Sequence, residues 1–280
     1  MSKVRSWASV AVLLAVAGCS SDSLTPEERG AGAMGHIHGI GVDPADGALY
    51  AATHTGLFRI EGQKASRVAD RWQDTMAFTV VGPRHFLASG HPGAGDDRPP
   101  HLGLIESKNA GKTWSALALD GRADFHALDL VGSTLYGYDS QSGQLMSTQD
   151  RRTFRPIEPI ALADIAADPR DNGVVLATTE TGLVAVDAET GKTTSLNAPR
   201  LIFIDWPKPN LLVGLDQEGT VHVSADSGRS WKSRGKAPGP PAALEVTERS
   251  WYAASEQGLF RSSDHGATWK PVGPRIQTSN

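Results

Sequence analysis

Cysteine is nearly absent from this sequence, and the single residue, Cys19, lies near the N-terminus. If Cys19 is modified, the folded part contains no disulfide. Basic residues are not in excess either, since 27 Lys and Arg are set against 31 Asp and Glu, for a formal net charge of −4. A nucleic-acid partner, which needs a basic stripe, is therefore not expected.

Helical periodicity and the common nucleophile motifs are also missing. No segment sustains a 3.6-residue apolar repeat, and the chain has no Gly-x-Ser-x-Gly, P-loop or His-Glu-x-x-His motif. We therefore assign no catalytic residue. Glycine and proline are plentiful instead, with 30 and 17 residues scattered along the chain. This distribution indicates many tight turns between short strands.

The N-terminus reads as an export signal. Lys3 and Arg5 precede an apolar run from Trp7 to Gly18, which is too short to span a bilayer as a stable helix. The run ends in Val-Ala-Gly-Cys19, which resembles the lipobox of bacterial lipoproteins. The resemblance implies removal of residues 1–18, acylation of Cys19 and anchoring on the extracytoplasmic face of the cell membrane. An ordinary secretory signal with Cys at its cleavage site is the alternative. Residues 19–34 then form a tether, and 276–280 a C-terminal tail.

The rest of the chain is repetitive. Short apolar strands recur before a turn glycine at intervals of 37 to 47 residues, at Gly56, Gly103, Gly143, Gly182, Gly219 and Gly258. A period near 40 with four strand-like runs per unit is typical of propeller blades. We predict an all-β, six-bladed β-propeller over residues 35–275, with four-stranded antiparallel blades at 36–72, 73–121, 122–160, 161–198, 199–237 and 238–275.

A second motif follows the third strand of several units. It reads Ser-x-Asp/Asn-x-Gly-x-Ser/Thr-Trp, and its three good copies centre on Asn109 with Trp114, Asp226 with Trp231, and Asp264 with Trp269. The motif resembles the Asp-box, or BNR, repeat of sialidase-like and sortilin-like propellers. In such a turn the Asp side chain accepts backbone N–H groups, the Gly takes a left-handed conformation, and the Trp packs between adjacent sheets. The resemblance therefore implies structural roles for these six residues.

The same resemblance raises the possibility of a glycosidase, which the residues do not support. A sialidase of this fold binds the substrate carboxylate with three arginines at the ends of inner strands, as bidentate guanidinium groups do well. No arginine lies in the predicted innermost strands, and Arg200 is the only one close by. An exo-sialidase-like activity would rest on fold analogy alone.

Histidine is unevenly distributed: six of the nine lie in the first two predicted blades, and His126 opens the third. In a propeller, the start of the innermost strand and the turn between the second and third strands lie at the same face. We therefore expect one mouth to collect a set of metal or ligand donors: His36, His38, His54, Met76, His91 and His126. His85, His222 and His265 lie elsewhere in their blades and are expected on the surface.

The donor types suggest a transition metal. Histidine with methionine suits copper, and a histidine set without cysteine also suits zinc. Asp74 and Asp124 begin their blades near the same rim, as direct ligands or as partners that orient an imidazole. The alternative is that these histidines are polar turn residues and strand-end packing.

Three functions remain open from the sequence. The first is a non-enzymatic, lipid-anchored propeller that binds copper, zinc or a small ligand at its histidine-rich mouth. The second is a scaffold for a protein partner at the same mouth. The third is an enzyme, either glycosidase-like or a hydrolase in which a bound metal activates water.

Overall fold

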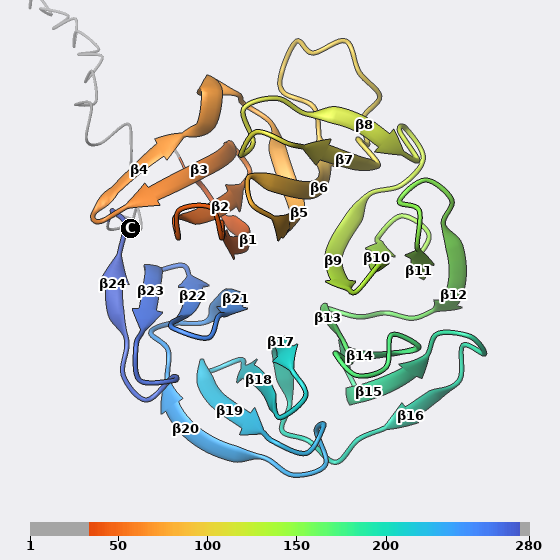
Figure 1. Ribbon diagram of the computed structural model, residues 1–280, viewed down its shortest axis with the longest axis vertical. Coiled ribbons are helices and arrows are strands. Elements are labelled where there is room, and N and C mark those ends of the chain that lie inside the picture. Colours follow the sequence, from red (N-terminus) through yellow and green to blue (C-terminus); the bar gives the residue numbers. More distant parts are fainter. Residues whose placement is uncertain (1–33, 275–280) are drawn as a thin grey trace, which may run out of the picture.

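The computed structural model describes residues 34–274, and Cys19, the predicted leader and the predicted C-terminal tail lie outside that range. Within it, the chain forms six four-stranded antiparallel sheets arranged around a central axis (Figure 1). The only helical element described is a single 3-10 turn, η1 (Val68–Asp70). The predicted all-β, six-bladed propeller is confirmed. Among these residues, no helix is long and apolar enough to cross a membrane.

The strands follow one another from the axis outward in every blade. The first three blades are β1 (Ile37–Val42), β2 (Leu49–Thr53), β3 (Gly56–Glu61) and β4 (Lys64–Arg67); β5 (Asp74–Gly82), β6 (His85–His91), β7 (Leu104–Ser107) and β8 (Ser115–Ala118); and β9 (Phe125–Val131), β10 (Thr134–Asp139), β11 (Gln144–Thr148) and β12 (Arg155–Pro159).

The remaining three blades repeat this order. They are β13 (Asp164–Ala167), β14 (Val174–Thr179), β15 (Gly182–Asp187) and β16 (Thr193–Ser195); β17 (Leu201–Lys208), β18 (Leu211–Asp216), β19 (Thr220–Ser224) and β20 (Lys232–Lys236); and β21 (Pro241–Val246), β22 (Trp251–Ser255), β23 (Gly258–Ser262) and β24 (Lys270–Val272). The second and third strands of each blade are apolar and mostly buried, whereas the fourth strands are largely exposed. The core therefore lies between neighbouring sheets.

The ring closes without exchange of strands between the two ends of the chain. Each sheet consists of four consecutive strands, so the first and sixth blades meet only through side chains and a few backbone contacts. A cluster of buried residues joins them, including Met34 and Phe58 from the first blade and Ala243 and Leu259 from the sixth. Apolar packing at this boundary therefore holds the disc closed.

The Ser-x-Asp turns have the hydrogen bonds expected of them. Ser224 Oγ donates to Asp226 Oδ1 (2.8 Å) and accepts the Gly228 N–H (2.8 Å), while Asp226 Oδ1 accepts the Ser230 N–H (2.8 Å). The turns at Asn109 and Asp264 repeat the pattern. Hydrogen bonds from Ser230 lower the pKa of Asp226 to about 2. The Ser and the Asp or Asn side chain of each turn therefore hydrogen-bond within that turn, as in a structural element.

The tryptophans of these turns are less buried than expected. Trp114, Trp231 and Trp269 are half-buried, each packed against the apolar cluster between two sheets. The fully buried indole is that of Trp251 in β22, at 1% exposure. It lies under the last of the turns, where a Cβ added at Gly266 would approach the Trp251 ring to 2.8 Å. The turn tryptophans therefore cover the core rather than fill it.

Candidate functional site

The histidine-rich mouth is built from strand ends and turns of the first three blades. His38 lies in β1, His54 in the turn between β2 and β3, Asp74 at the start of β5, and His91 opposite it at the end of β6. Antiparallel pairing brings the start of each first strand beside the end of the second, so all four positions lie at one face of the disc.

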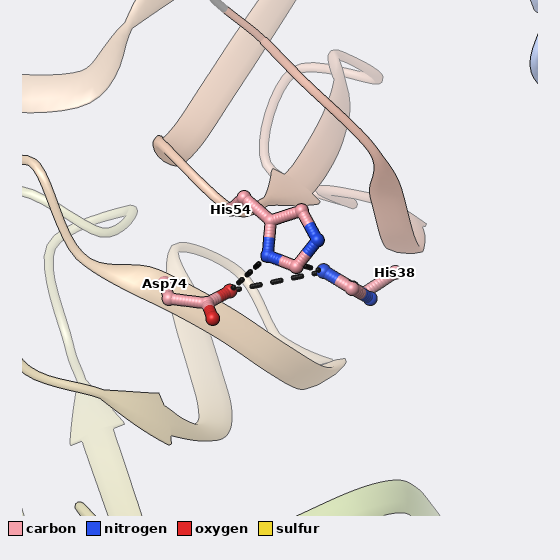
Figure 2. A group of neighbouring side chains, drawn as sticks. All are labelled: His38, His54 and Asp74. Atoms are coloured by element: carbon pink, nitrogen blue, oxygen red, sulfur yellow. Dashed lines mark hydrogen bonds and ion pairs between the residues drawn. The ribbon is translucent and has the colours of Figure 1, made fainter. Parts of the chain in front are cut away.

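Three of these side chains converge on one point, and we call them the first triplet (Figure 2). His38 Nε2 lies 3.2 Å from His54 Nδ1, His54 Nδ1 lies 3.2 Å from Asp74 Oδ1, and His38 Nε2 lies 3.7 Å from the same oxygen. A tetrahedral ion with bonds of about 2.0–2.1 Å holds its ligand atoms about 3.3 Å apart. The triangle therefore has the size of one face of such a coordination shell.

One linear hydrogen bond accounts for only one of the two short contacts of His54 Nδ1. His54 Nδ1 lies 3.2 Å from both a ring nitrogen and a carboxylate oxygen, yet it can carry only one hydrogen. Burial, followed by the neighbouring His54 and His36, lowers the pKa of His38 to about 4. His38 is therefore neutral at physiological pH, and its lone pair is available to a metal ion.

A second group of the same composition lies beside the first, and we call it the second triplet. It contains His91, His101 and Asp124, whose ligand atoms all lie within 4.8 Å of one another. His126 Nε2 lies 3.0 Å from Asp124 Oδ2, which also accepts from Ser140 Oγ (3.1 Å). Burial raises the pKa of Asp124, but the hydrogen bond and charge of His126 outweigh it and hold that pKa below its usual value.

The remaining expected donors lie around these triplets. His36 is exposed just before β1, with its ring centroid 5.0 Å from that of His38. Met76 is half-buried at the bulge of β5 between Thr75 and Ala77, and its role as a ligand remains a prediction. Asp74 and Asp124 each lie within ion-pair distance of two or more histidines.

His101, in the loop between β6 and β7, is a further donor that was not predicted from the sequence. The sequence nevertheless contains a pattern that indicates this position. His54 stands two residues before the turn glycine Gly56, and His101 stands two residues before the equivalent Gly103. The two histidines therefore occupy corresponding places in neighbouring blades. His222, in contrast, was expected on the surface but is 9% exposed, with Nε2 2.9 Å from Asp216 Oδ2.

Gly90 allows the close approach of strands at the centre of the site. Its φ is +146°, and a Cβ at this position would lie 2.0 Å from the carbonyl oxygen of Asp74. Any larger residue would push Asp74 out of line with His91, which faces it across the strand pair. The Gly90 backbone thus positions the carboxylate that contacts both triplets.

Below the mouth, the channel along the axis is narrow and lined with acid groups. A cavity of about 130 Å³ is bounded by the six innermost strands. Four carboxylates line it, and each accepts a backbone N–H from the next blade: Asp129 from Ala167, Asp164 from Ile204, Asp205 from Val246, and Glu245 from Val42. Burial raises the pKa of all four, to about 7 for Asp164 and Glu245. These carboxylates link the blades.

No arginine of the described chain lines this channel, so the three-arginine clamp of a sialidase is not assembled there. Arg200, the nearest candidate in the sequence, is exposed and donates to the Glu180 carbonyl oxygen. The two triplets are the His and Asp groups of the described residues whose ligand atoms lie close enough together to hold one metal ion.

Comparison with known proteins supports the fold and goes no further. No protein-family model and no curated protein matches the sequence. Among solved structures, the extracellular domain of a hybrid two-component system from B. thetaiotaomicron is similar, with a TM-score of 0.58, 14% identity, and 88% of this chain and 34% of that chain covered. Virginiamycin B lyase from Staphylococcus aureus has a TM-score of 0.56 and 11% identity over 85% of this chain and 84% of its own.

PorZ, a surface component of the type-IX secretion system of Porphyromonas gingivalis, has a TM-score of 0.54 and 14% identity over 89% of this chain and 35% of its own. This chain therefore spans about a third of the length of two of the three structures. At such low identity, the shared property is the propeller fold.

Proposed function

We propose that this protein is a lipid-anchored propeller on the outer face of the cytoplasmic membrane that binds a divalent transition metal ion, Zn(II) or Cu(II), at its mouth. The ion is held by the first triplet, His38, His54 and Asp74. The observation that carries this proposal is the triangle of two imidazole nitrogens and one carboxylate oxygen with sides of 3.2, 3.2 and 3.7 Å.

The donor set favours these ions over others. Imidazole suits zinc and copper, whereas magnesium and calcium prefer shells made only of oxygen. The carboxylate is a hard ligand, which favours Cu(II) over Cu(I) at this triplet. Side-chain exposure is 12% for His38, 24% for Asp74 and 50% for His54, so the site is half-enclosed and leaves room for water or a further ligand.

The anchoring rests on the sequence. Lys3 and Arg5, the apolar run and Cys19 supply the three parts of a lipoprotein leader. The neighbours in fold include an extracellular domain and a bacterial surface component, which fits a domain outside the cytoplasm.

The test is metal binding by the mature chain, purified with a tag that contains no histidine. After chelator treatment, the protein is loaded with Zn(II) or Cu(II), and bound metal is measured by elemental analysis and chelator competition. We expect at least one tightly bound ion, and His38→Ala to weaken binding at the first triplet by more than about tenfold, the lower bound for losing even a partner of a ligand.

His265→Asn is the matched control. His265 is exposed, lies outside both triplets and has a φ of +58°, which Asn tolerates. It should leave binding unchanged. A wild-type protein that retains neither ion, or a His38→Ala variant that binds as wild type does, would contradict the proposal and leave a partner-docking scaffold as the function to pursue.

A further inference from the structure

The second triplet has a feature that the first lacks: two of its polar atoms are buried with no hydrogen-bond partner. These atoms are His101 Nδ1 and Asp124 Oδ1. The Asp124 side chain is only 4% exposed, so water does not easily satisfy it. An unpaired buried polar atom is costly, and a carboxylate oxygen is more costly than a neutral group. A cation between these side chains would give His101 Nδ1 a partner, and it would also satisfy Asp124 Oδ1 if the carboxylate bound it through both oxygens.

The geometry of the second triplet suits an ion of the same kind. His91 Nε2 lies 3.5 Å from Asp124 Oδ2, and His101 Nδ1 lies 3.9 Å from the same oxygen. These separations are wider than the tetrahedral spacing of about 3.3 Å, so binding would draw the three side chains closer together. His126, hydrogen-bonded to Asp124 Oδ2, holds the carboxylate in place.

One hydrogen bond connects the two triplets. Asp74 turns Oδ1 toward His54 in the first triplet and Oδ2 toward His91 Nδ1, which lies 3.1 Å away. A histidine that donates Nδ1–H to a carboxylate keeps its lone pair on Nε2, and this is the arrangement commonly found behind metal-bound imidazoles. Asp74 is thus a ligand in one triplet and the orienting partner of a ligand in the other.

We propose that the mouth holds two divalent transition metal ions, the second bound by His91, His101 and Asp124 and coupled to the first through the Asp74–His91 hydrogen bond. This inference rests on the proposed function. An ion on Asp74 Oδ1 withdraws electron density from Oδ2, which makes His91 a weaker donor to the second ion. Repulsion between the two cations acts in the same direction. The second ion therefore binds more weakly when the first is present.

The experiment uses variants that touch one triplet each. His54→Ala removes a donor from the first triplet alone, and His101→Ala removes one from the second alone. Wild-type mature chain should bind two Zn(II) or Cu(II) ions in two steps, and each variant should lose one. The ion kept by His54→Ala should bind more tightly than the second ion of wild type, because its coupling partner is gone. His265→Asn should keep both ions.

The outcomes that contradict the proposal can be told apart by the number of bound ions and by the variant that loses them. One ion in wild type that is unchanged in His101→Ala would overturn the second site and leave the proposed function standing. No ion in wild type would overturn both. One ion that is lost in His101→Ala but kept in His54→Ala would overturn the two-ion mouth and move the site to the second triplet. In Cu(II)-loaded protein, electron paramagnetic resonance adds a direct check, since spin–spin broadening should appear in wild type and vanish in both variants.

Discussion

Truncation of Phe58 tests how much apolar packing contributes to closing the ring. Phe58 is 1% exposed and lies in the cluster that joins the first and sixth blades. Deleting a buried Phe side chain costs about 3–5 kcal/mol, from lost burial and the cavity left behind. The Arg67 guanidinium, 4.9 Å from the Phe58 ring centroid, loses a further contact of about 0.5–1 kcal/mol. We therefore expect Phe58→Ala to lower the free energy of unfolding by about 4 kcal/mol.

The assay is equilibrium unfolding in urea, followed by tryptophan fluorescence and circular dichroism. Phe125→Ala is the matched control, because Phe125 is 0% exposed and lies between the second and third blades. In a cooperative disc both variants should lose similar stability in one transition. A Phe58→Ala loss within about 0.5 kcal/mol of zero, as for a surface substitution, would show that this boundary is not packed as described.

Three further predictions concern the anchor, the turns and the channel. Cys19→Ala should move the protein from the membrane fraction to the soluble or unprocessed one, and unaltered membrane association would refute lipidation. Trp231→Ala should destabilise the fold by less than the roughly 3–5 kcal/mol expected at the fully buried Trp251, because Trp231 is only half-buried. Asp164→Asn should change the pH dependence of stability. Burial raises the pKa of Asp164 to about 7, so the folded state retains a proton that the unfolded state releases near pH 4. The free energy of unfolding of wild type therefore falls between about pH 4 and 7 because of this carboxyl group. The uncharged Asn side chain has no such dependence, so the stability of Asp164→Asn relative to wild type should rise over that interval. A relative stability that is the same at pH 5 and pH 8 would exclude this account.

The sequence alone was sufficient for the architecture because the determinants of a propeller are local and repeated. Each blade carries its own turn glycine and alternating apolar strands, and these signals recur about every 40 residues. The predicted strand boundaries also placed four donors at one face: His38, His54, Asp74 and His91. The face at which a residue lies depends only on which end of its strand it occupies. The same rule applies to His101, which precedes Gly103 as His54 precedes Gly56.

Only the tertiary structure determined which of those donors belong to the first triplet and which to the second. Strand periodicity puts His36 and His38 on one side of the chain, and their ring centroids do lie 5.0 Å apart, but it does not predict the bulge in β1 between Ile37 and Gly39. The convergence of His38 with His54 and Asp74, and the two directions of the Asp74 oxygens, depend on three segments packed side by side. A sequence pattern specifies the end of a strand, whereas an atom's position to within an ångström follows from the bulges, glycines and burial around it.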